Sequence, residues 1–134
     1  MKRMICALMC FVLLIAMSSV VSASNETGVY EYEINGTEYT VEFEDKNISS
    51  DKKVMIAETL LGLRDDSAQT YGLGCTLFGH DWVTKTVFVT EHKVYPTIPR
   101  CLRHTYDVTY CEDCDKTKEE VLISSAYVNC CAED

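Results

Sequence analysis

The residues best suited to chemistry lie in the second half of the chain, where cysteine and histidine stand between strand-like segments. A Phe78-Gly79-His80-Asp81-Trp82 stretch is followed by Cys101 and then by Cys111-Glu112-Asp113-Cys114. A spacer of two residues lets both sulfurs of a Cys-x-x-Cys turn point at one centre, and the flanking strands then form a hairpin. The spacing predicts a small knuckle that is closed by zinc or by disulfides.

Three antiparallel strands are expected to position these residues. The segment 83–95 is rich in valine and threonine, and Pro96 and Pro99 end it. Apolar and polar residues then alternate over 104–110, and apolar residues recur over 121–127 after the knuckle. The Cys-x-x-Cys turn should therefore join the last two strands of this unit.

The first half of the chain predicts a β-hairpin between residues 29 and 43. Apolar residues alternate with polar ones on both sides of Asn35-Gly36, a dipeptide typical of a type I′ turn. Closing the hairpin there places tyrosine and aliphatic side chains on one face. The register then pairs Ile34 with Thr37, Glu33 with Glu38, Tyr32 with Tyr39, and Tyr30 with Val41.

One amphipathic helix is expected to follow, from about residue 51 to residue 61. Ser49, Ser50 and Asp51 are typical of a helix start, and apolar residues then recur at spacings of three and four. Gly62 is a suitable terminator. Residues 64–70 are polar, which indicates an exposed loop before the cysteine-rich half.

These elements predict an α+β protein with three regions. Residues 1–23 are expected to be a cleaved signal peptide, and residues 24–70 to hold the hairpin and the amphipathic helix. Residues 71–134 are expected to form a separate, small three-stranded antiparallel unit that is rich in cysteine and histidine. A mature chain of this size builds only a modest core, so covalent or metal cross-links should matter.

The first residues indicate export. Lys2 and Arg3 precede an apolar run that ends near residue 17, and Val21 and Ala23 are small residues at the positions that signal peptidase reads.

Removing Lys2 and Arg3 leaves ten basic residues against 21 acidic ones. So acidic a chain is a poor ligand for nucleic acid. We therefore expect a secreted, extracellular protein with no membrane attachment after cleavage and an unknown extracellular or cell-surface partner.

The motifs of the second half resemble those of a known group. Gly79-His80-x-Trp82, Pro99-x-Cys101 and Tyr106-x-Val108-x-x-Cys111-x-x-Cys114 are similar to zinc-ribbon-like repeats in secreted and surface proteins of gut Firmicutes. The stretch from about Tyr71 to Cys131 also resembles short, uncharacterised exported proteins of these bacteria. The resemblance implies a bacterial, zinc-ribbon-like unit without an assigned activity. It also implies that His80, Cys101, Cys111 and Cys114 hold a structural zinc ion.

An all-disulfide framework is the alternative for the cysteines, because the chain is expected to be exported. Six cysteines remain after cleavage, and they allow fifteen pairings. With zinc on four ligands, Cys75, Cys130 and Cys131 are left as disulfide candidates. A bond from Cys75 to Cys130 or Cys131 would tie the end of the chain to the start of the unit.

We expect this protein to act by binding and not by catalysis. The alternative function is thiol-disulfide exchange at Cys111-x-x-Cys114, but such sites usually open a helix, and the flanks here are strand-like and acidic. A zinc hydrolase using His80, His92 and His104 lacks the His-Glu-x-x-His helix motif. The sequence thus favours a secreted structural or binding protein.

Cleavage of the signal peptide gives a direct test. We expect the secreted protein to begin at Ser24, because Val21 and Ala23 meet the spacing that the peptidase requires. Intact-mass measurement of the secreted form checks this. A mass that includes Met1 would contradict the expectation.

Overall fold

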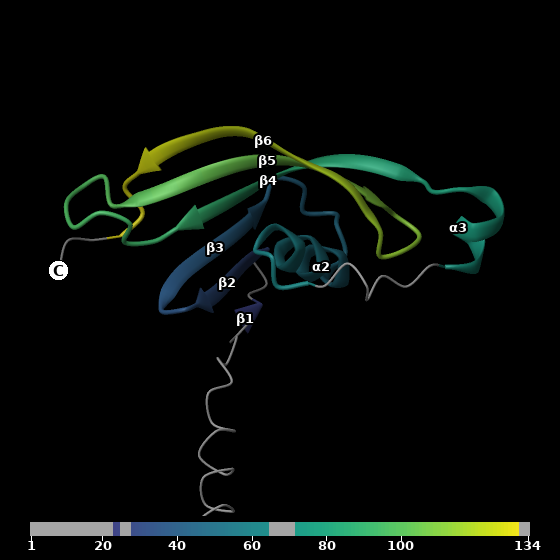
Figure 1. Ribbon diagram of the computed structural model, residues 1–134, viewed down its shortest axis with the longest axis horizontal. Coiled ribbons are helices and arrows are strands. Elements are labelled where there is room, and N and C mark those ends of the chain that lie inside the picture. The colour runs from purple at the N-terminus through teal and green to yellow at the C-terminus, as the bar shows by residue number, and fades with distance from the viewer. Residues whose placement is uncertain (1–22, 25–27, 65–71, 132–134) are drawn as a thin grey trace, which may run out of the picture.

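The computed structural model describes residues 23–24, 28–64 and 72–131, and the expected signal peptide lies outside them except for Ala23. These residues form one antiparallel sheet whose six strands follow one another in sequence order (Figure 1). The strands are β1 (Ala23–Ser24), β2 (Val29–Ile34), β3 (Thr37–Phe43), β4 (Trp82–Glu91), β5 (Cys101–Cys111) and β6 (Thr117–Val128). The helices are α2 (Ser50–Leu60) and α3 (Leu73–Phe78).

The hairpin prediction is confirmed, including its register. β2 pairs with β3 so that Ile34 faces Thr37 and Tyr32 faces Tyr39. Asn35 and Gly36 have φ angles of 54° and 80°. Both angles lie in the left-handed region that a type I′ turn requires.

The helix prediction is also confirmed to within one residue at each end. The Ser49 side chain accepts a hydrogen bond from the Lys52 backbone N–H, at 3.4 Å, so it caps the first turn of α2. Asp51 places a negative charge at the positive end of the helix dipole. The helix stops just before Gly62, whose φ is 66°.

The predicted α+β class, with a hairpin-and-helix region followed by a separate three-stranded unit, is wrong. β3 pairs with β4 over five residue pairs, from Tyr39 opposite Glu91 to Phe43 opposite Val87. The hairpin and the last three strands are therefore one continuous sheet, accompanied by two short helices. Alternation of polar and apolar residues predicts that a segment is a strand, but it does not predict which distant strand that segment will pair with.

One hydrophobic core joins the two halves of the chain. α2 lies against one face of the sheet (Figure 1), and its Ile56 is fully buried. The same core contains Val41 from β3, Val87 from β4 and Val108 from β5, each 0% exposed. Burying an aliphatic side chain of this kind stabilises the fold by roughly 1.5–3 kcal/mol.

The last strand forms one edge of the sheet and is exposed along most of its length. Val121, Leu122 and Ile123 are 41%, 51% and 55% exposed. Lys118 and Glu119 are also exposed on this strand, and charged residues on an edge strand discourage pairing with other sheets. No helix among the described residues is long and apolar enough to cross a membrane.

The turn of the hairpin provides a stability test. We expect Gly36→Val to destabilise the protein by about 1–3 kcal/mol, because a β-branched residue is strained at positive φ. A Cβ at this position meets no atom within 4 Å, so the cost is conformational and not a clash. Gly36→Asn is the matched control, because asparagine tolerates this backbone region. Equal melting temperatures for the two variants would contradict the turn assignment.

Candidate metal centres

Four potential ligands meet at one end of the sheet, and we call them the knuckle cluster: Cys75, His80, Cys111 and Cys114. Cys111 is the last residue of β5, and it lies opposite Trp82, the first residue of β4. This register brings His80 to the knuckle. Cys75 comes from α3, and Cys114 from the turn before β6. Their ligand atoms all lie within 4.8 Å of one another.

Two spacings within the knuckle cluster are close to those of a tetrahedral zinc site. The Sγ atoms of Cys75 and Cys111 are 3.6 Å apart, and His80 Nδ1 is 3.3 Å from Cys114 Sγ. Zinc–sulfur bonds of about 2.3 Å place tetrahedral sulfurs about 3.8 Å apart. Cys75, Cys111 and Cys114 are 5%, 0% and 5% exposed, so water is largely excluded from the sulfurs.

Two of these thiols differ in acidity. Burial, together with hydrogen bonds shared with Cys114 and Cys111, raises the pKa of the Cys75 thiol to about 12. Burial also acts to raise the pKa of the Cys111 thiol, but hydrogen bonds from the His80 side chain and the Asp113 and Cys114 backbone lower it to about 6. The cluster therefore holds one thiolate readily, and a bound cation would favour the others.

Backbone hydrogen bonds hold the knuckle against its neighbours. The Cys111 N–H donates to the Lys116 carbonyl at 2.9 Å, which closes the turn between β5 and β6. The Glu112 N–H donates to the Asp81 carbonyl at 2.9 Å, which ties the turn to the residue after His80. The His80 and Trp82 ring centroids lie 4.7 Å apart, so the indole packs beside the imidazole.

The helix α2 reaches the knuckle through one lysine. Lys52 Nζ donates to the Cys111 carbonyl at 3.2 Å and also to the Cys114 carbonyl. The same ammonium group lies 3.5 Å from the Asp115 carboxylate. The Lys52 side chain is only 16% exposed, so these contacts are partly shielded from water. A single cation thus binds both cysteine carbonyls of the Cys-x-x-Cys turn.

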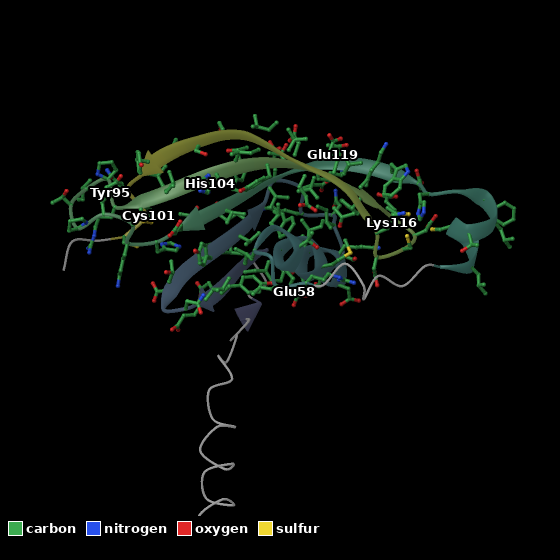
Figure 2. The ribbon with its side chains drawn as sticks, in the orientation of Figure 1. Glu58, Tyr95, Cys101, His104, Lys116 and Glu119 are labelled. Atoms are coloured by element: carbon green, nitrogen blue, oxygen red, sulfur yellow. A yellow bond between two sulfur atoms is a disulfide. The ribbon has the colours of Figure 1, made fainter. Side chains whose placement is uncertain are left out.

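A second group lies at the opposite end of the same strands, and we call it the far-end cluster: His92, Cys101, Cys130 and Cys131. His92 directly follows β4, Cys101 begins β5, and the last two cysteines follow β6. Cys101 and Cys130 form a disulfide. Figure 2 shows Cys101 at one end of the sheet and Lys116 of the knuckle turn at the other.

The ligand set inferred from the sequence is therefore only partly brought together. His80, Cys111 and Cys114 do meet, but Cys101 lies at the other end of β5 from Cys111. An extended strand of this length separates its ends by roughly 33 Å, because each residue adds about 3.3 Å. Cys75, and not Cys101, is the fourth member of the knuckle cluster.

The expected link from Cys75 to Cys130 or Cys131 is likewise absent from the described residues. Cys75 is a free thiol in the knuckle cluster, and Cys130 is bonded to Cys101. The sequence motifs suggested His92 only as a ligand of a disfavoured zinc hydrolase, so they did not predict the far-end cluster. The order of the strands could have indicated it. When three consecutive strands are antiparallel, the connection between the first two lies at the same end of the sheet as the residues that follow the third. His92 and Cys101 flank such a connection, and Cys130 and Cys131 follow the third strand.

No family model matches this chain, and no curated protein or solved structure matches it. The resemblance to exported proteins of gut Firmicutes thus rests on the motif residues alone.

Replacing Lys52 tests the support of the knuckle. We expect Lys52→Met to lower the free energy of unfolding by about 1–3 kcal/mol, because two carbonyls lose a charged donor while the aliphatic stem is kept. Chemical denaturation measures the change. Lys46→Met is the control, because Lys46 is an exposed lysine outside the helix. An equal effect of both changes would contradict the proposed support.

Proposed function

We propose that the chain is a secreted structural or binding protein whose sheet is held together by a zinc ion at the knuckle cluster. The observation that carries this proposal is the convergence of four ligand atoms within 4.8 Å of one another. The ligands come from a helix, a connection, a strand end and a turn. A metal ion at this point would therefore join segments that meet only in the folded chain.

The chemistry of the ligands favours zinc. Three sulfurs and one imidazole nitrogen are soft or borderline donors, which bind zinc in preference to calcium or magnesium. Four protein ligands leave no open coordination position for water or substrate. This supports a structural role for the metal and a binding role for the protein.

The surface offers some support for binding. β6 carries three consecutive apolar side chains, Val121, Leu122 and Ile123, which are each at least 41% exposed. Apolar side chains that gather on one strand are typical of contact surfaces. The formal net charge of −9 disfavours nucleic acid as the partner. An extracellular or cell-surface partner fits these properties better.

The alternative function is thiol-disulfide exchange at Cys111-x-x-Cys114. Two observations count against it. The cysteines are 0% and 5% exposed, so a second disulfide would reach them poorly. Cys111 also ends β5 and Cys114 lies in the turn before β6, so neither is at the start of a helix. Redox function would require these two residues to cycle between dithiol and disulfide, whereas the metal proposal requires both to stay reduced.

Metal content of the purified protein tests the proposal. We expect one zinc ion per chain while the Cys101–Cys130 disulfide is intact, and none in His80→Ala, because that change removes a ligand. His104→Ala is the matched control, since His104 lies on β5 outside both clusters and hydrogen-bonds to Ser125 Oγ at 2.7 Å. Elemental analysis measures the ratio.

Chelation provides the second measurement. Zinc at such a site should contribute on the order of 10 kcal/mol to folding. A chelator should therefore unfold the end of the sheet around the knuckle in the absence of reductant. A protein that carries no metal in the wild-type form and ignores chelators would overturn the proposal.

A further inference from the structure

The far-end cluster places one nitrogen against three sulfurs. His92 Nδ1 lies 3.1 Å from Cys130 Sγ, 3.2 Å from Cys131 Sγ and 3.8 Å from Cys101 Sγ. One ring atom is thus close to all three cysteines. A disulfide alone requires neither the imidazole nor the third thiol to be present.

The distances between the sulfurs are also short. Cys131 Sγ is 3.5 Å from Cys101 Sγ and 3.5 Å from Cys130 Sγ. The edges of a tetrahedral zinc site with sulfur ligands are about 3.8 Å long. Five of the six distances between the ligand atoms are 3.1–3.8 Å, and the sixth joins the two cysteines of the disulfide.

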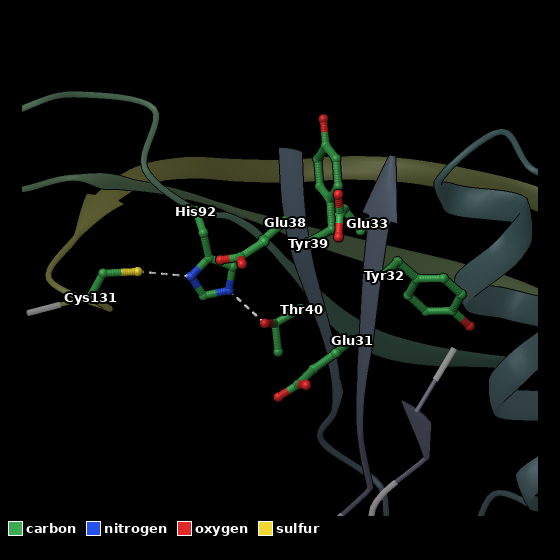
Figure 3. A pocket seen from close by; sticks show the side chains of 8 residues that line it. All are labelled: Glu31, Tyr32, Glu33, Glu38, Tyr39, Thr40, His92 and Cys131. Atoms are coloured by element: carbon green, nitrogen blue, oxygen red, sulfur yellow. Dashed lines mark hydrogen bonds between the residues drawn. The ribbon is translucent and has the colours of Figure 1, made fainter. Parts of the chain in front are cut away.

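The histidine is oriented from its other side. His92 Nε2 lies 2.5 Å from Thr40 Oγ1 (Figure 3). The His92 backbone N–H donates to the Glu38 carbonyl at 2.9 Å. With Nε2 donating its proton to the threonine hydroxyl, Nδ1 carries a free lone pair directed at the sulfurs. Metal-bound histidines usually have such a partner, which fixes the tautomer and the ring orientation.

The surroundings suit a cation. A hollow of about 420 Å³ adjoins His92 and Cys131 and is lined in part by Glu31, Glu33 and Glu38. Glu38 and His92 line the same hollow (Figure 3). Carboxylates that line a hollow raise the local concentration of cations. The hollow also gives an ion a route to the cluster from solvent.

We propose that the far-end cluster is a second metal site, in which His92 Nδ1 and the thiolates of Cys101, Cys130 and Cys131 bind zinc or a similar divalent ion when the disulfide is reduced. The disulfide and the metal site are alternative states of the same residues. Both states tie the start of β5 to the segment after β6. This inference does not depend on metal at the knuckle cluster.

The two states are linked by a balanced exchange. A dithiol reductant gives two electrons and two protons to the Cys101–Cys130 disulfide and becomes a cyclic disulfide itself. The divalent ion then displaces one proton from each of the three thiols and accepts the Nδ1 lone pair. The reverse process releases the ion and requires a two-electron oxidant, such as a small disulfide.

Metal titration in the two redox states tests the inference. The protein is reduced with dithiothreitol, freed of reductant without oxygen, and titrated with zinc against a chromophoric chelator. We expect one more zinc ion per chain than in the oxidised protein. Cobalt in place of zinc should show visible absorption typical of tetrahedral thiolate coordination. Equal metal content in the two redox states would overturn the proposal.

Three variants make the test specific. Cys131→Ser leaves the Cys101–Cys130 disulfide intact, so the oxidised variant keeps this cross-link, but the reduced variant should lose the additional ion. Thr40→Val should weaken binding of that ion by about 10–100-fold, as expected for loss of an orienting hydrogen bond. His104→Ala should change nothing. An additional ion that persists unchanged in Cys131→Ser would overturn the assignment.

The same experiment separates this proposal from the one for the knuckle. If the knuckle binds no metal, the oxidised protein holds none, while the reduced protein still gains one ion that Cys131→Ser removes. If the far-end cluster binds no metal, both redox states hold the knuckle ion alone.

Discussion

The antiparallel pairing of β5 with β4 and β6 is the constraint on which both cysteine clusters depend. β5 begins with Cys101 and ends with Cys111, so its register decides which residues meet each cysteine. A shift of one residue would turn every side chain of a strand to the other face of the sheet. The fully buried Val87 and Val108 oppose such a shift, because it would expose them. Core packing thus favours one register of β5, and with it the positions of Cys101 and Cys111.

The parts of the fold that could be predicted are those with local signals. Asn35-Gly36 carries its own backbone preference, and Ser49 and Gly62 mark the ends of α2 through contacts within a few residues. The union of the hairpin with the last three strands has no such signal. It depends on the pairing of β3 with β4, which are separated by a long segment of the chain. The alternation of polar and apolar residues in β3 would be the same if β3 paired with any other strand.

The same distinction explains the candidate sites. Cys111 and Cys114 are fixed by a spacing of two residues, and His80 lies just before the strand that pairs with Cys111, so these three were predictable. Cys75 was not, because its place depends on the short helix α3. Cys130 and Cys131 lie beyond the end of β6. The rule that strand neighbours point to opposite faces therefore does not separate their sulfurs, which lie 3.5 Å apart.

The contact between α2 and the knuckle has a consequence for how this sequence can change over time. Lys52 binds main-chain carbonyls, and the Glu112 N–H that meets Asp81 is also main chain. These groups are present for every residue type in the turn except proline, which lacks the N–H. The exposed Glu112 and Asp113 can therefore be exchanged for other residues without loosening the helix from the turn. The exposed side chains of this turn can therefore change, and with them the surface charge, while the main-chain contacts that hold the turn are kept.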